Sequence, residues 1–168
     1  PLYVGIKYGN DGMNVAMSIA AKTSTDKVFV ESIDCQSVRN GNAWILDFIS
    51  KANVEMVVVD GASGQDLLTA EMKRARIRPY PILPKVKEVI TAYSAFERGI
   101  HLETIAHKNQ PSLTQVVTNS EKRPIGSNGG FGYKSQFEDY DIALLDSVAL
   151  AHWACSESKP KKIQKVRY

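Results

Sequence analysis

Two aspartates that lie far apart in the sequence are the residues best placed to carry chemistry. Asp60 ends the apolar run Met56–Val59 and is followed by Gly-Ala-Ser-Gly, so we expect its carboxylate at the carboxyl edge of a buried sheet. Ligands bind at such edges in α/β folds. Asp141 stands immediately before the apolar stripe of the last predicted helix, 141–153, and can point toward the same edge. Each could instead be a turn or helix-capping aspartate, because Asp is favoured at both kinds of position.

Carboxylates that gather around a cavity repel one another unless a divalent cation neutralises them. Oxygen ligands favour Mg²⁺ or Mn²⁺ over zinc. Two such ions about 4 Å apart clamp the attacking and leaving oxygens of a phosphodiester. Asp60 and Asp141 therefore predict a hard-metal site that cuts a nucleic-acid backbone. Asp146 follows Asp141 by about 140° around the same helix, and we expect it to face away from that site.

No other catalytic pattern in the sequence is as coherent. His101, His107 and His152 lack metal-ligand spacing, and Cys35 and Cys155 form no CxxC pair. The sequence contains no GxSxG nucleophile elbow and no GxxxxGK[ST] phosphate loop. It also contains no apolar stretch long enough to span a membrane and no signal-peptide pattern at its N-terminus. We therefore do not expect acyl transfer, redox chemistry or P-loop ATP hydrolysis. We also do not expect a membrane location.

The positive charge of the chain is concentrated at its end. Residues 159–168 hold five of the 21 basic residues and no acid, whereas residues 1–158 hold 16 basic and 18 acidic residues, a net charge of −2. A basic run of this kind is typical of a solvated tail, and it would also attract a polyanion such as DNA. With 168 residues the chain is the size of one domain. We predict a single folded domain over 1–156 and a basic C-terminal tail over 157–168.

The pattern of apolar residues predicts an α/β fold. Three strands open the chain, and their short connections favour antiparallel pairing. Strands and helices then alternate, and the apolar run at 55–60 is typical of a central strand buried on both faces. The Gly- and Asn-rich segment 123–134 predicts a β-hairpin. The predicted strands are 2–6, 14–21, 27–33, 55–60 and 80–83, and the predicted helices are 41–52, 65–75, 87–99, 111–119 and 141–153.

Five segments together resemble a known family. They are YVGIKYG at 3–9, VVVDGASG at 57–64, KEVITAYSAFERGIH at 87–101, IAHKNQPSLTQVVTN at 105–119 and DYDIALLDSVALAHWA at 139–154. The order of strands resembles a ribonuclease H-like fold, and the finer pattern resembles the C-terminal nuclease domain of the large terminase subunit of tailed bacteriophages. The resemblance implies a mixed sheet, with three antiparallel strands followed by parallel strands, flanked by helices and carrying a β-hairpin near the active site.

The resemblance also implies where a metal would bind. In that family, metal-binding aspartates end the first strand, end the central strand and begin the last helix. The last two positions fall on Asp60 and Asp141, but the first falls on Lys7, where the chain reads GIK in place of GID. Three explanations stay open. Lys7 pairs with Asp60 and Asp141 and weakens or abolishes cleavage, or Asp11 supplies the missing ligand, or the lysine was introduced to silence a toxic nuclease.

Basic residues are assigned to DNA by the same resemblance. The hairpin at 126–134 would lie beside the metal site, with Arg123 and Lys134 holding a phosphate near the scissile bond. Lys85 and Lys87, which follow the predicted strand 80–83, would extend a DNA track. The alternative for the hairpin charges is an ordinary solvated loop.

The function that this resemblance implies is a metal-dependent DNA endonuclease. It would cut concatemeric double-stranded DNA during genome packaging, with two Mg²⁺ or Mn²⁺ ions, in the cytoplasm of an infected bacterial host. Its partners would be DNA, the N-terminal ATPase half of the terminase, the portal and the small terminase subunit. Two alternatives stay open: a non-catalytic module that binds DNA or docks on the motor, and a resolvase-type ribonuclease H-like nuclease.

Overall fold

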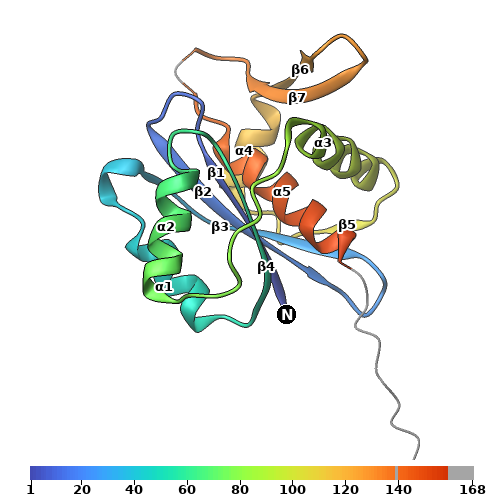
Figure 1. Ribbon diagram of the computed structural model, residues 1–168. Helices are drawn as coiled ribbons and strands as arrows, with labels where there is room; N and C mark the ends of the chain where they lie inside the picture. Colours follow the sequence, from blue (N-terminus) through green and yellow to red (C-terminus); the bar gives the residue numbers. More distant parts are fainter. Residues whose placement is uncertain (139, 159–168) are drawn as a thin grey trace, which may run out of the picture.

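A computed structural model describes residues 1–138 and 140–158 (Figure 1). Most of the predicted tail, 159–168, lies outside these ranges. The strands are β1 Leu2–Tyr8, β2 Asn14–Lys22, β3 Val28–Ser37, β4 Val54–Asp60, β5 Ile105–Ala106, β6 Ser120–Ile125 and β7 Gly130–Ser135. The helices are α1 Ala43–Lys51, α2 Gln65–Ala75, α3 Val86–His101, α4 Pro111–Thr118 and α5 Ala143–Glu157, with a short 3-10 helix at Val38–Asn40.

A five-stranded mixed sheet forms the centre of the fold. Its order is β4-β1-β2-β3-β5. Strands β1, β2 and β3 are antiparallel, β4 pairs with β1 in parallel, and β5 pairs with β3 in parallel. Helices α1 and α2 cover one face, and α3, α4 and α5 lie on the other (Figure 1). The mixed α/β architecture expected from the sequence is therefore confirmed.

Strand β4 differs from its expected place in the sheet. It is not central. Among the described residues, its outer edge meets only Ile82, whose backbone N–H bonds to the Val57 oxygen at 2.8 Å and whose oxygen accepts from the Val59 nitrogen at 3.0 Å. The predicted strand 80–83 is thus reduced to one bridge, because the prolines around Ile82 have no N–H to give to a ladder. The apolar run of β4 reflects its two covered faces, since Val57 and Val59 are buried on one side and Val58 on the other.

Helix α5 is buried on all sides, although the sequence showed only an apolar stripe. Every residue from Ala143 to Cys155 is buried, because the helix lies between the sheet and helices α3 and α4. A close approach to β1 makes this possible. A Cβ placed at Gly5 would lie 2.2 Å from the Ser147 backbone oxygen and 2.4 Å from the Ala151 nitrogen. The backbone of α5 therefore packs directly on the sheet at Gly5.

Other elements agree with the sequence. Helix α2 occupies the predicted range 65–75, and α4 begins with a proline at its first turn. The predicted hairpin is formed by β6 and β7, which pair in antiparallel and form a separate two-stranded sheet. Among the described residues, no helix is long and apolar enough to cross a membrane.

The close packing at Gly5 gives a stability prediction. Gly5→Ala is expected to lower the free energy of unfolding by about 1–3 kcal/mol, because the added methyl group meets backbone atoms of α5 that have no rotamer to change. Urea denaturation measures the difference. Ser94→Ala, on the exposed side of α3, is the control and should change stability little. Equal stability of the Gly5→Ala variant and the native chain would contradict the packing described.

Candidate active site

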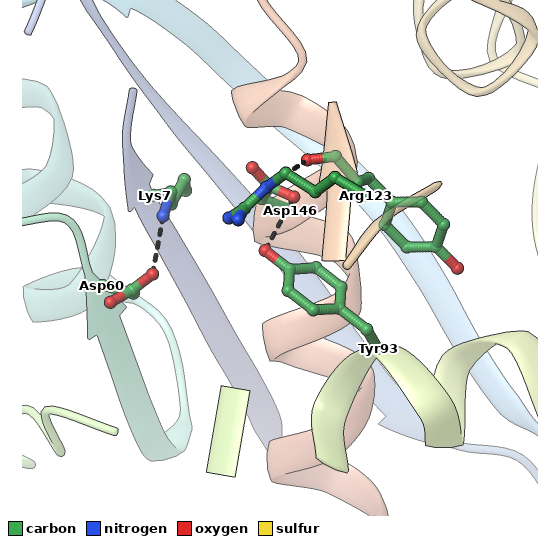
Figure 2. A network of polar contacts seen from close by, with 6 residues as sticks. Lys7, Asp60, Tyr93, Arg123 and Asp146 are labelled. Atoms are coloured by element: carbon green, nitrogen blue, oxygen red, sulfur yellow. Dashed lines mark hydrogen bonds and ion pairs between the residues drawn. The ribbon is translucent and has the colours of Figure 1, made fainter. Parts of the chain in front are cut away.

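An ion pair joins the ends of β1 and β4. The parallel register places Lys7 opposite Asp60, so both side chains stand at the carboxyl edge of the sheet. The Lys7 Nζ lies 2.6 Å from Asp60 Oδ2 (Figure 2). Lys7 is buried, and the Asp60 side chain is 21% exposed. Asp60 does not cap α2, whose N-cap is Gly64.

Asp146 of α5 belongs to the same cluster. It is buried, and the Tyr93 hydroxyl on α3 donates a hydrogen bond to its Oδ1 at 2.8 Å (Figure 2). Burial raises the pKa of Asp146 to about 6, and the negative charge of Asp60 adds to this rise. The positive charges of Lys7 and Arg123 and the hydrogen bond from Tyr93 act in the opposite direction. The edge of the sheet therefore holds two carboxylates with an ammonium and a guanidinium close enough to act on them.

The position of Asp146 corrects the expectation that it faces away from Asp141. Both aspartates line one cavity of about 200 Å³. The angle of about 100° per residue applies only inside a helix, and Asp141 lies outside it: α5 begins at Ala143, with Ile142 as N-cap. The chain before the helix is thus free to bring Asp141 back toward the face that carries Asp146.

Asp141 and Asp11 lie next to each other, beside Gly9. Asp141 Oδ1 accepts a hydrogen bond from the Ala143 nitrogen at 2.6 Å, which is a capping contact. Asp141 Oδ2 is buried and has no hydrogen-bond partner among the described residues. Asp11 Oδ1 accepts from the Met13 nitrogen at 2.9 Å. A Cβ at Gly9 would lie 3.1 Å from an oxygen of each carboxylate, so the absence of a side chain there leaves room between them.

The basic residues assigned to DNA are divided between two places. Arg123 and Lys134 of the hairpin line the same cavity as Asp141 and Asp146. The Arg123 Nε donates to the Tyr133 backbone oxygen at 3.3 Å (Figure 2), and the Lys134 ammonium pairs with Glu121 across the hairpin at 3.1 Å. Lys85 and Lys87 are exposed at the start of α3 and do not line this cavity.

The acids present do not fit a two-metal centre. In residues 1–138 and 140–158, no three His, Cys, Asp or Glu side chains gather closely enough to hold a metal ion. The Lys7 ammonium contacts the Asp60 carboxylate, so a cation of the protein already neutralises that acid. Asp141 does not share this ion pair but bonds to the backbone at Ala143. Asp141 Oδ2 lies near Asp11 and has no hydrogen-bond partner among the described residues. It is the carboxylate oxygen of the site that no donor in these ranges satisfies.

The sequence did not predict the role of Tyr93, and it predicted the wrong orientation for Asp146. Only for Asp146 does the sequence pattern indicate a place in the site. It is the one charged residue between Ile142 and Cys155. A single carboxylate in a helix that is apolar on every side is buried with it and has to find donors. Tyr93 has no comparable signal, because nothing local in α3 indicates that its hydroxyl reaches α5.

Comparisons with known proteins show the fold. No model of a protein family and no curated protein matches the sequence. Among solved structures, the large terminase of bacteriophage HK97 is similar, with a TM-score of 0.72 and 14% identity over 91% of this chain. The large terminase nuclease of thermophilic phage G20c has a TM-score of 0.70 and 14% identity over 94% of this chain. A structure of that nuclease with bound magnesium has a TM-score of 0.67 and 13% identity over 90% of this chain.

The extent of these matches differs between the proteins. This chain spans 39% of the HK97 protein, but 82% and 79% of the two G20c nuclease structures. The similarity therefore covers nearly all of this chain and most of an isolated terminase nuclease. The chain has the ribonuclease H-like fold of large terminase nucleases.

The raised pKa of Asp146 predicts a pH-dependent stability. The pKa of Asp146 is about 6 in the folded state, against 3.8 ordinarily, so the folded state binds this proton more tightly than the unfolded state. The protonated carboxyl group therefore stabilises the fold fully below pH 3.8, and this stabilisation is lost as the pH rises from 3.8 to 6. Asp146→Asn keeps an acceptor for Tyr93 but cannot ionise. Between pH 4 and 7, the native chain should therefore lose about 2 kcal/mol of unfolding free energy relative to this variant.

Urea denaturation at each pH measures this difference. Asp47→Asn is the matched control, because Asp47 is exposed on α1 and pairs only with Lys51 at the surface. If the native chain and the Asp146→Asn variant kept a constant difference across this pH range, Asp146 would not be the buried, partly neutral acid described.

Proposed function

We propose that this chain is the nuclease domain of a viral genome-packaging terminase, which hydrolyses phosphodiester bonds of concatemeric double-stranded DNA and whose cleavage is weakened by Lys7. The observation that supports it most is the meeting of Asp60 and Asp146 at the carboxyl edge of the sheet, with Lys7 between the strand ends. The fold, similar to terminase nucleases over most of the chain, supports it as well.

The proposal gives the acids and Lys7 opposite effects on cleavage. Mg²⁺ or Mn²⁺ would be the cofactor. Asp60, Asp141 and Asp11 would have to move together to hold it, since as described they do not gather closely enough to bind an ion. The Lys7 ammonium, 2.6 Å from Asp60, competes with any ion for that carboxylate. An ammonium on a strand cannot leave the site as a hydrated ion does, so we expect cleavage by the native chain to be slow and to need a high metal concentration.

The basic residues would hold the substrate. Arg123 and Lys134 line the cavity shared by Asp141 and Asp146, which places them to contact a phosphate beside the acids. Phosphate contacts carry no sequence information, and none of the described helices has the setting of a recognition helix. We therefore propose cleavage with little sequence preference.

The biological setting follows from the family resemblance. We place residues 1–156 as the nuclease domain, with 157–168 as a basic tail that attracts DNA. The partners would be an N-terminal ATPase half, the portal and the small terminase subunit, in the cytoplasm of an infected bacterium. This chain spans 39% of the HK97 large terminase, so that similar protein is longer than the domain proposed here.

A second candidate function is a non-catalytic module that binds DNA or docks on the packaging motor. The Lys7–Asp60 ion pair favours it, because a site whose acid is already neutralised has less need of a metal ion. The two candidates differ in hydrolysis, and a module that only docks on the motor would also not bind DNA.

Nicking of supercoiled plasmid in Mn²⁺ separates them. We expect slow nicking by the native chain and at least about tenfold faster nicking by Lys7→Asp, which is a barrier change of about 1.4 kcal/mol. Asp60→Asn should lose nicking in both backgrounds, because the acid that would hold the ion is gone. Asp47→Asn, a change of the same charge on α1, is the control and should nick like the native chain.

One outcome would contradict the nuclease activity, and another would contradict only its weakening by Lys7. If neither the native chain nor folded Lys7→Asp nicks DNA while both bind it, the non-catalytic module is correct. If the native chain nicks quickly and Lys7→Asp nicks no faster, Lys7 does not weaken the site. Circular dichroism of each variant checks that loss of activity is not loss of fold.

A further inference from the structure

A run of positive charge lies in the segment that joins α2 to α3. Residues 73–87 hold six basic residues and no acid, whereas the rest of 1–158 holds ten basic and eighteen acidic residues, a net charge of −8. All six are exposed, and none forms an ion pair within the described part of the chain. The basic strip, as we call this set, consists of Lys73, Arg74, Arg76, Arg78, Lys85 and Lys87.

The basic strip follows β4 from one end to the other. The segment after α2 returns alongside β4 (Figure 1), and Ile82 bonds to Val57 and Val59 in parallel. Two residues later, the chain is level with Asp60. Lys85 therefore stands at the carboxyl edge of the sheet, and Arg78 stands toward the end where β4 begins. Six residues lie between the two, and even a fully extended chain of that length spans at most about 25 Å.

The end of the basic strip formed by Lys85 and Lys87 lies near the candidate active site. Lys85 and Lys87 flank the first residue of α3. One turn further along α3, Ile90 packs under the hairpin, since a Cβ at Gly130 would lie 2.9 Å from its Cδ1. The next turn carries Tyr93, which bonds to Asp146. The positive surface along β4 thus ends beside the hairpin and the buried acids.

The chemistry of the basic strip fits a nucleic-acid backbone better than a protein. A duplex carries one phosphate per strand for about every 3.4 Å of its axis, so several phosphates come within reach of a strip of this length. The apolar side chains of this segment, Tyr80, Ile82, Leu83 and Val86, are 37–67% exposed, and all six basic side chains are exposed beside them. The centres of protein–protein interfaces are depleted in charged residues, whereas protein–DNA interfaces are strongly positive.

We propose that the basic strip is a track for the backbone of duplex DNA, which guides it along the edge of β4 to the site at Asp60. It rests on the proposed function for the identity of the substrate, but not on hydrolysis. The sequence indicated Lys85 and Lys87 alone; the structure adds Arg76 and Arg78, which lie between the end of α2 and the bridge at Ile82.

The test is the salt dependence of binding to a fluorescent duplex of about 30 base pairs in EDTA, where hydrolysis does not intervene. Two double variants remove opposite ends of the basic strip: Arg76→Gln with Arg78→Gln, and Lys85→Gln with Lys87→Gln. Each should weaken binding at least about tenfold at 0.1 M salt and lower the slope of log K against log salt by about 1.8, or 0.9 for each lost phosphate contact.

The control removes the same charge elsewhere. Lys27 and Arg98 are exposed near the opposite edge of the sheet, by β5, and form no ion pair in the described residues. Lys27→Gln with Arg98→Gln should leave the slope unchanged. An equal loss in this control would mean that only net charge matters, and it would overturn the track.

The remaining outcomes separate the track from the proposed function. If the native chain binds DNA and both strip variants bind equally well, the basic strip is a surface for another partner, such as an acidic protein, and only the track fails. A loss confined to Lys85 and Lys87 also overturns the track, because contact then stops at the site. No DNA binding by the native chain would overturn the track and the proposed substrate together.

Discussion

The Lys7 ammonium is the charge on which the site depends. Asp60 and Asp146 act on each other at an edge of the sheet where solvent is largely excluded, and burial disfavours the charged form of Asp146. Lys7 offsets this by pairing with Asp60 at 2.6 Å and by favouring ionised Asp146. Lys7 is buried and Asp60 is partly exposed, so removing the ammonium leaves Asp60 without its ion-pair partner, and the lysine is part of the structure of the site. The Lys7 ammonium neutralises the carboxylates of the site, as a metal ion does in sites where several carboxylates lie close together.

The fold explains why these groups meet. The parallel register of β1 and β4 sets Lys7 beside Asp60. Gly5, two residues before Lys7, lets α5 lie directly on β1 and so brings Asp146 over the same edge. Helix α3, on top of α5, then reaches Asp146 through Tyr93. Each contact joins segments far apart in the sequence, which is why the site forms only with the complete fold.

Local patterns predicted the elements well and the site in part. The apolar run before Asp60 identified a strand covered on both faces, and the glycines near 126–132 identified the hairpin, because both depend on neighbouring residues. The place of β4 in the sheet was wrong, since it depends on whether the segment around Ile82 can pair. Asp146 was expected to face away from Asp141, because the helical angle per residue was applied to Asp141, which lies outside the helix. The pairing of Lys7 with Asp60 was foreseen as one of three readings, through a family resemblance and not through local pattern.

The central claim is that a lysine stands where a metal ion would neutralise Asp60. Calorimetric titration of Mn²⁺ into the native chain and into Lys7→Asp, without DNA and at neutral pH, tests it most directly because it measures metal occupancy and not turnover. We expect a saturable site in the variant and binding at Asp60 at least about tenfold weaker in the native chain, so that at metal concentrations that saturate the variant Asp60→Asn changes the native titration little. Stoichiometric binding of two ions by the native chain, lost in Asp60→Asn, would contradict it.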